Sequence, residues 1–194
     1  MDKIETLRDR SKVRIRHLKM DDLDPLMKFY LSLPPRDRNY LRVDVTDKEQ
    51  VRERLKLIET GNVARIAAFL LSDIIAVGAL EISPEEWRKH QAELRVIVNR
   101  DYRRKGLGTI LMRELYFLAV EKKVESIVAK MMRPQRAARK ICRRLGFHDE
   151  VTIPDYVKDH AGHKQDLVVM TCDINEFWKE LDHFYNLTDW RRCR

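Results

Sequence analysis

A chain of 194 residues with a formal net charge of +8 is long enough to bury a hydrophobic core of its own. No apolar run approaches the roughly 18 residues of a membrane span, and the charged start at residues 1–3 lacks the apolar stretch of a signal peptide. These features exclude the membrane-spanning and secreted classes and predict a cytoplasmic protein.

The spacing of apolar residues predicts a series of strands and helices. Residues that alternate in polarity indicate strands, and apolar residues three or four positions apart indicate helices. Taken in chain order, the expected elements are a strand at 12–18, a helix from Asp21 or Asp22 to Leu33, a polar connection at 36–42, a helix at 47–60, strands at 63–71, 74–82 and 92–98, a helix at 108–122, a strand at 124–130, a short helix opened by 132–135 and ended by Gly146, strands at 151–157 and 166–172, and a helix at 175–185.

The same spacing predicts which side chains face the core. In the strand at 92–98, one face is formed by Leu94, Val96 and Val98 and the other by Glu93, Arg95 and Ile97. Two helices are expected to direct apolar side chains inward, the first through Leu23, Leu26, Met27, Tyr30 and Leu31, and the short one through Ala138, Ile141, Cys142 and Leu145. No internal repeat or flexible linker interrupts the series, so we expect one domain over 1–194, with 175–194 as a C-terminal helical extension.

The positive charge is concentrated in one segment. Positions 100–144 contain 14 Lys or Arg residues and four acidic residues, whereas the rest of the chain contains 25 basic and 27 acidic residues. A basic segment attracts an anionic partner. Nucleic acid and the phosphates of a small cofactor both remain open on charge alone.

A basic turn with two glycines follows the strand at 92–98. It reads Arg103-Arg104-Lys105-Gly106-Leu107-Gly108, and the expected helix continues through Thr109. Glycine allows a ligand to approach the backbone, and the N–H groups of a first helical turn face an anion at the positive end of the helix dipole. The spacing fits neither a Walker A loop nor a dinucleotide fingerprint. The turn therefore predicts a phosphate site, with an ordinary basic helix start as the alternative.

The turn has the form R-x-x-G-x-G, which resembles the pyrophosphate loop of the acyl-coenzyme A-dependent N-acetyltransferases of the GNAT superfamily. A second motif of that family, N-x-x-A-x-x-x-Y-x-x-x-G-F, is similar to the segment that starts at Gln135. Ala138, Gly146 and Phe147 match it, whereas Gln135 replaces the usual Asn and Cys142 the usual Tyr. The resemblance covers roughly 13–172 and implies an α/β (α+β) fold, in which helices flank a mixed, mostly antiparallel central sheet.

More narrowly, the chain is similar to the catalytic domain of bacterial protein lysine acetyltransferases of the Pat type. Three stretches carry this similarity: residues 29–33 with 38–42, residues 92–94, and residues 139–147. The resemblance implies a primary amine acceptor, with lysine acetylation as the expected reaction and acetyl-CoA as the acyl donor.

The resemblance also implies roles for individual residues. Glu93 matches the position of the general base, which a lysine acceptor requires because its amine is protonated near neutral pH. Its alternative role is that of a strand-edge glutamate paired with Arg95 or solvent. His90 is a reserve base. Residues expected to bind the cofactor are Val96, Ile97 and Val98 through their backbone, Arg103, Arg104, Lys105, Gly106, Leu107, Gly108 and Thr109 in the turn, and Gln135.

Other signals in the sequence are weaker. Cys142 could protonate a leaving sulfur, but a buried apolar role on a helix face is the stronger reading. The cysteines, with Cys172 and Cys193 completing the set, fit neither a disulfide framework nor a zinc motif, and His160-x-x-His163 lacks metal-ligand spacing, so no metal is expected.

Three alternatives to lysine acetylation remain open. The same chemistry could act on a small amine or on a protein N-terminus. A non-catalytic module that senses acyl-CoA or binds nucleic acid could use the same fold, although the presence of Glu93 argues against it. Oligomeric state is not predicted.

Overall fold

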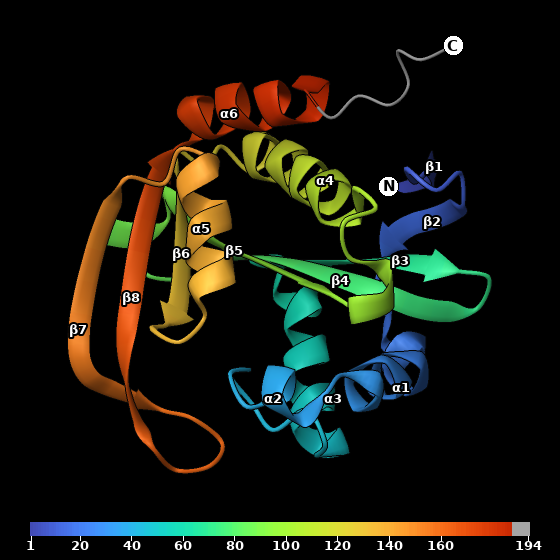
Figure 1. Ribbon diagram of the computed structural model, residues 1–194, viewed down its shortest axis with the longest axis horizontal. Coiled ribbons are helices and arrows are strands. Elements are labelled where there is room, and N and C mark those ends of the chain that lie inside the picture. Colours follow the sequence, from blue (N-terminus) through green and yellow to red (C-terminus); the bar gives the residue numbers. More distant parts are fainter. Residues whose placement is uncertain (188–194) are drawn as a thin grey trace.

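The computed structural model describes residues 1–187, except for the side chains of residues 149, 150 and 184–187. Eight strands form one sheet in the order β1-β2-β3-β4-β5-β6-β8-β7 (Figure 1). Every neighbouring pair is antiparallel except β5 and β6, which confirms the mixed, mostly antiparallel sheet. The strands are β1 (Asp2–Thr6), β2 (Lys12–His17), β3 (Val63–Leu70), β4 (Asp73–Ile82), β5 (Gln91–Val98), β6 (Ser126–Met132), β7 (Asp149–Lys158) and β8 (Lys164–Asp173).

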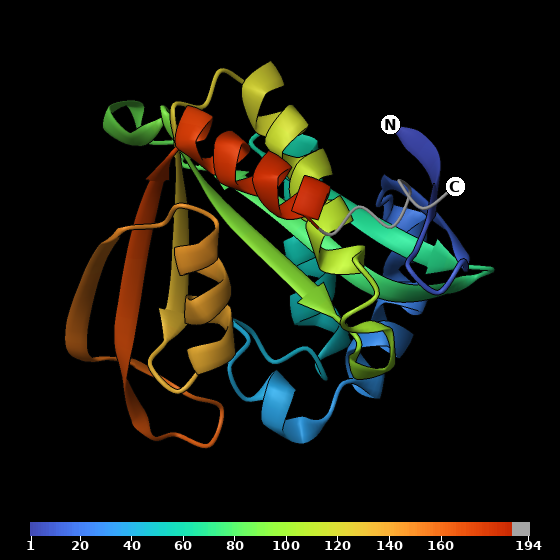
Figure 2. The ribbon, with the colours of Figure 1, turned by 45° about the horizontal axis from the view of Figure 1, so that its top comes forward.

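Helices cover both faces of the sheet (Figures 1 and 2). One hydrophobic core lies between the sheet and helices α4 and α6. A second lies between the opposite face of the sheet and helices α1 and α3. None of the helices in the described part of the chain is long and apolar enough to cross a bilayer. The helices are α1 (Leu23–Ser32), α2 (Pro35–Arg38), α3 (Lys48–Lys56), α4 (Leu107–Glu121), α5 (Arg136–Arg144) and α6 (Ile174–Leu187).

The close approach of α4 to β4 fixes where α4 begins. A Cβ atom at Gly78 would lie 3.0 Å from Cδ1 of Leu115 and 3.2 Å from Cγ1 of Ile66. Leu111 and Leu115 are fully buried on the same side of the sheet. Glycine at this point of β4 lets the helix pack directly on the strand, and this packing places the first turn of α4 at the end of β5.

The first strand was missed by the sequence analysis. β1 contains one strongly apolar residue, Ile4, whose exposed fraction is 72%, so the strand shows no polarity alternation that could signal burial. Pairing with β2 and ion pairs stabilise it instead: Nζ of Lys3 lies 2.5 Å from Oε2 of Glu114, and Arg113 pairs with Glu5 at 2.7 Å. Glu114 is buried in α4, so β1 attaches the edge of the sheet to that helix.

The direction of helical side chains departs from expectation at three positions. Leu31 is 52% exposed, and Phe29, which was not expected to face inward, is 2% exposed. Ile141 is 47% exposed, and the short α5 contains no fully buried residue. The expected polar connection at 36–42 begins inside a short helix, α2, which starts at Pro35 as its fixed backbone angle favours. The predicted C-terminal helix is present as α6, and residues 188–194 of the expected extension, Cys193 included, lie outside the described residues.

Substitution of Gly78 tests the contact between α4 and β4. We expect Gly78→Val to lower the free energy of unfolding by about 1–3 kcal/mol, the usual cost of extra carbons in a packed core. Gly78→Ala should cost less, because the nearest atom to the added methyl group is the flexible end of Leu115. Chemical denaturation measures both values. A valine variant as stable as the original protein would show that α4 does not pack tightly on this strand.

Candidate functional site

The parallel pairing of β5 and β6 ends after three residue pairs. Gln91–Glu93 pair with 126–128, and beyond Val128 the strand β6 pairs only with β8. Figure 2 shows the two strands separating from this point. Backbone groups of residues 94–97 on the β6 side of β5 therefore lack a strand partner, and buried backbone groups require one. An extended ligand between the strands would supply it.

The predicted faces of β5 are confirmed. Leu94, Val96 and Val98 pack against the core beneath α4, and Ile97 packs against the core beneath α1 and α3. The side chains of Val96 and Val98 therefore belong to the core, and only their backbone atoms are available to a ligand. Glu93 shares its face with Ile97 and points toward the α1–α3 side.

The turn between β5 and α4 has the backbone geometry of an anion site. Gly106 is the residue before the first turn of α4, with φ of +87°, and it has no side chain to accept hydrogen bonds from that turn. Its carbonyl oxygen already accepts from the N–H of Ile110 at 3.1 Å. The N–H groups of Leu107, Gly108 and Thr109 precede that bond and have no acceptor within the helix. They are available to an anion.

The three basic side chains of the turn differ in their surroundings. Nη2 of Arg103 lies 2.7 Å from Asp37, and its Nε donates to the carbonyl oxygen of Val98 at 3.0 Å. Lys105 pairs with Asp9 at 3.0 Å, and hydrogen bonds from Ser11 and from Lys105 lower the pKa of Asp9 to about 2. Arg104 has φ of +63° and no ion pair with a described carboxylate. Its charge is the one left for a ligand.

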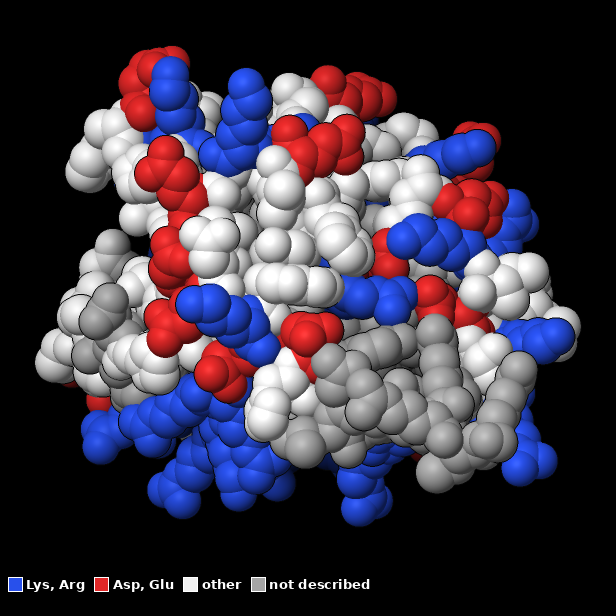
Figure 3. Space-filling model, turned by 90° about the horizontal axis from the view of Figure 1, so that it is seen from above, with Lys and Arg blue, Asp and Glu red and all other residues white. Residues whose placement is uncertain are grey.

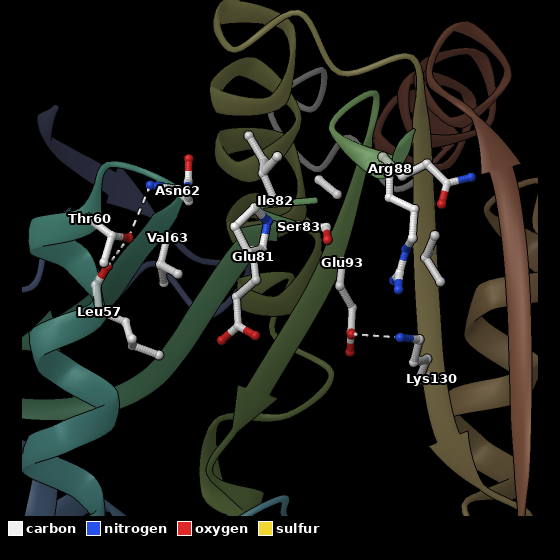
Figure 4. Close-up of a pocket in the computed structure, with 14 residues that line it drawn as sticks. Leu57, Thr60, Asn62, Val63, Glu81, Ile82, Ser83, Arg88, Glu93 and Lys130 are labelled. Carbon is white, nitrogen blue, oxygen red and sulfur yellow. Dashed lines mark hydrogen bonds and ion pairs between the residues drawn. The ribbon is translucent and has the colours of Figure 1, made fainter. Parts of the chain in front are cut away.

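Glu93 lines a cavity of about 340 Å³ that we call the Glu93 cavity. In Figure 4, Glu81, Glu93 and Lys130 project into it from β4, β5 and β6, and Leu57 and Thr60 form the opposite wall. Glu81 and Glu93 are direct cross-strand neighbours. The sequence analysis missed Glu81, because nothing local to the strand at 74–82 indicates that this carboxylate faces Glu93.

Cations outnumber carboxylates around Glu81 and Glu93. Glu93 is in ion-pair contact with Arg42, and it lies 3.6 Å from Nζ of Lys130 and 3.9 Å from Nε of Arg95. Glu81 pairs with Arg42, Arg54, Arg65 and Arg95. The alternative pairing of Glu93 with Arg95 is thus present, together with two further cations. Five cationic side chains surround two carboxylates whose side chains are 12% and 16% exposed.

Charge and burial act together on the protonation of this cluster. Burial raises the pKa of Glu81, but the four guanidinium groups together lower it further, so the net pKa lies below its usual value. Burial and the nearby Arg95 lower the pKa of Arg42 to about 10, and burial with neighbouring cations lowers the pKa of Lys130. Arg42 therefore remains charged at neutral pH.

One segment, residues 35–42, connects the parts of the site. Asp37 in α2 accepts from Arg103 and Arg100 of the turn, at 2.7 and 3.3 Å. The carbonyl oxygen of Leu41 lies 2.8 Å from Nε2 of His160 in the β7–β8 connection, and the next residue, Arg42, contacts Glu93. The role of His160 is therefore to hold this segment, a long-range contact that the sequence did not predict.

Gln135 and Cys142 lie on the β6 side of the split. Oε1 of Gln135 accepts from the N–H of Met132 at 2.8 Å, which leaves its amide NH₂ group available to a ligand. Burial raises the pKa of the Cys142 thiol to about 11. His90, the reserve base, is exposed and does not line the Glu93 cavity. Its carbonyl oxygen accepts from the N–H groups of Glu125 and Ser126 and so aligns the start of β6.

Comparison with known proteins agrees with this geometry. The model of the family described as acetyltransferase (GNAT) matches residues 27–147. No curated protein matches the chain in sequence. Among solved structures, the chain is similar to the GNAT domain of S. lividans PAT, with a TM-score of 0.71 and 18% identity over 89% of this chain and 96% of that one.

Two further solved structures are similar. A ribosomal-protein-alanine N-acetyltransferase from Brucella melitensis gives a TM-score of 0.68 and 25% identity over 82% of this chain and 98% of that chain. YncA of Salmonella typhimurium, whose structure contains acetyl-CoA as its cofactor, gives 0.69 and 17% identity over 84% and 94%. The fold and the sequence family thus agree, while the neighbours differ in what they are named for.

The ion pairs of Glu81 predict a pH-dependent contribution to stability. We expect Glu81→Gln to lower the free energy of unfolding at pH 7 by about 3 kcal/mol, the lower end of the cost of removing one partner from a buried pair. Because the pKa of Glu81 in the folded state lies below the ordinary 4.5, this difference should be complete above pH 4.5 and vanish as pH falls through the folded-state value. Denaturation of both proteins between pH 2 and 7 measures it. A difference that persists at the lowest pH would contradict this origin.

Proposed function

The chain belongs to the GNAT family of acetyltransferases, and from this premise we propose that it acetylates a primary amine of a protein, with Glu93 as the general base. The observation that carries the proposal is the position of Glu93. It is the last residue of β5 that pairs with β6, and its side chain lines a cavity at the point where the strands separate. A base at that point can reach an amine that attacks a thioester held between the two separating strands.

The residues of the split fit acetyl-coenzyme A. This cofactor supplies the thioester carbonyl that an amine attacks. Its pyrophosphate matches the open N–H groups of the first turn of α4, next to Gly106, with Arg104 as the added charge. The edge of β5 that lacks a strand partner beyond Glu93 suits an extended amide-containing arm, and the NH₂ group of Gln135, which follows β6, is available to donate to it.

Glu93 and the backbone of β5 have different roles in the proposed reaction. An ionised Glu93 accepts the proton of the incoming amine, either directly or through one water. N–H groups of β5 that lack a strand partner can donate to the oxygen on which negative charge develops during attack. Arg42 contacts Glu93 in this structure, so the amine must displace that contact or share the carboxylate with it.

Cys142 is unsuited to act as the acid for the leaving sulfur. A free thiol has a pKa of about 8.5, whereas burial raises that of Cys142 to about 11. Transfer of a proton from Cys142 to a leaving thiolate would therefore be uphill. The packing role predicted for this residue fits its surroundings better.

A lysine side chain is the first candidate acceptor, supported by the shared fold of the PAT domain. A protein N-terminus is the second. An α-amino group, with a pKa of about 8, is easier to deprotonate near neutral pH than a lysine side chain, with a pKa of about 10.4, and requires less assistance from a base. Peptides in which only one of the two amines is free would distinguish the candidates.

The assignment of the base can be tested with the neighbouring carboxylate as a matched control. We expect Glu93→Gln to lower kcat for thiol release from acetyl-CoA by about a hundredfold or more, the lower part of what a general base contributes. Glu81→Gln removes a charge from the same cluster and should lower kcat less than tenfold. If the Glu81 variant shows the larger loss, Glu81 is the base. If no amine supports turnover by the original protein, the proposed function fails.

The packing role of Cys142 gives a second test. Cys142→Ala should retain kcat within about threefold across pH 6–9, because the thiol is too weak an acid to assist a leaving thiolate. Steady-state kinetics and denaturation curves should be measured on the same sample. A large fall in kcat without a loss of stability would show that the thiol takes part in the reaction.

A further inference from the structure

A second cavity, of about 680 Å³, lies between α2, the start of α5 and the start of β8. We call it the basic cavity. Five of its lining side chains are cationic, and its only acidic lining residue among those the structure describes is Asp166, which pairs with Arg133 at 2.9 Å. The cationic side chains are Arg36, Arg133, Arg136, Arg139 and Lys164.

Several of these charges are uncompensated. Arg36, Arg136 and Lys164 form no ion pair with any carboxylate in the described part of the chain. They come from three different elements, so folding brings them together despite their mutual repulsion. Viewed over α4 and α6, basic side chains also gather along one edge of the molecule, whereas the rest of that face mixes both signs (Figure 3). Like charges held around one cavity predict an anionic occupant.

The basic cavity and the Glu93 cavity share no lining residue, but β6 leads from one to the other. Lys130 lines the Glu93 cavity, and Arg133, three residues further along the chain, lines the basic cavity. At a rise of about 3.3 Å per residue, this separation is about 10 Å. The segment 35–42 contributes Arg36 to the lining of the basic cavity, and its Arg42 contacts Glu93. An extended polypeptide with its amine at Glu93 would place a residue about three positions away in the basic cavity.

We propose that the basic cavity binds acidic side chains of the acceptor polypeptide, about three residues from the acetylated amine. This inference rests on the proposed function, because it assumes that the amine reaches Glu93. The ion pairs of Glu81 and Glu93 support it as well, since five cations contact these two carboxylates and the excess positive charge repels a positively charged acceptor. Acidic neighbours of the amine offset that repulsion. The acceptor specified by this chain is thus an amine within an acidic sequence.

The test compares peptides that differ only in the flanking charge. Each peptide carries one free amine, on a lysine or at the N-terminus, with Asp, Asn or Arg at positions three and four from it. At low salt we expect the Asp peptide to exceed the Asn peptide by about tenfold in kcat/KM, through KM, and the Arg peptide to be the poorest. The preference should shrink as the salt concentration rises.

Variants of the basic cavity test whether this cavity causes the preference for the Asp peptide. Arg36→Gln with Arg136→Gln should reduce the preference for Asp over Asn to less than threefold and leave KM for acetyl-CoA unchanged. Both side chains are exposed, so folding should not be affected. The matched control is Lys12→Gln with Lys179→Gln, which removes the same charge from exposed positions elsewhere and should keep the preference.

Other outcomes overturn the proposal in distinguishable ways. An increase in KM for acetyl-CoA in the Arg36 and Arg136 double variant would assign the cavity to a phosphate of the cofactor. Competition by a short RNA that the double variant abolishes would assign it to nucleic acid. If no peptide is acetylated, fluorescence anisotropy still decides: tighter binding of the Asp peptide to the original protein than to the double variant supports the cavity, and equal binding rejects it.

Discussion

The site depends on one interruption of hydrogen bonding, the end of the β5–β6 ladder after Glu93 and Val128. Every other neighbouring pair in the sheet is antiparallel, and β6 leaves β5 to continue with β8 alone. A split inside a sheet exposes backbone groups that must be satisfied. The chain maintains the split because each strand is held on its other side, β5 by β4 and β6 by β8. This arrangement places the basic turn around Gly106 at the end of β5 and Gln135 at the end of β6.

Electrostatics then restrict what the split can accept. Glu81 and Glu93 lie side by side on β4 and β5, an arrangement that would be repulsive without the cations around them. Arg42, Arg65 and Arg95 offset that repulsion, and with Arg54 and Lys130 they give the cluster an excess of positive charge. If Glu93 is the base, as we propose, the acceptor must enter this positive field.

Features with a local cause could be predicted from the sequence. The strand–turn–helix unit around Gly106 was predicted because glycine, basic residues and apolar spacing each act over a few positions, and the two faces of β5 were predicted from alternation alone. β1 was missed because its polar residues show no pattern until β2 lies beside it. The neighbours of Glu93 were missed for a similar reason. Arg42 and Glu81 are 51 and 12 positions away along the chain, and no local pattern shows that folding places them at its carboxylate.

The segment 35–42 links the two halves of the site in a way that neither half would reveal alone. Through Asp37 it holds two arginines around the phosphate turn, and five residues later Arg42 reaches the general-base candidate. The β7–β8 connection fixes the same segment by the contact of His160 with Leu41. A ligand that displaces Arg103 from Asp37, or an amine that displaces Arg42 from Glu93, therefore acts on one short piece of backbone. The basic turn and Glu93 are thus linked through this segment.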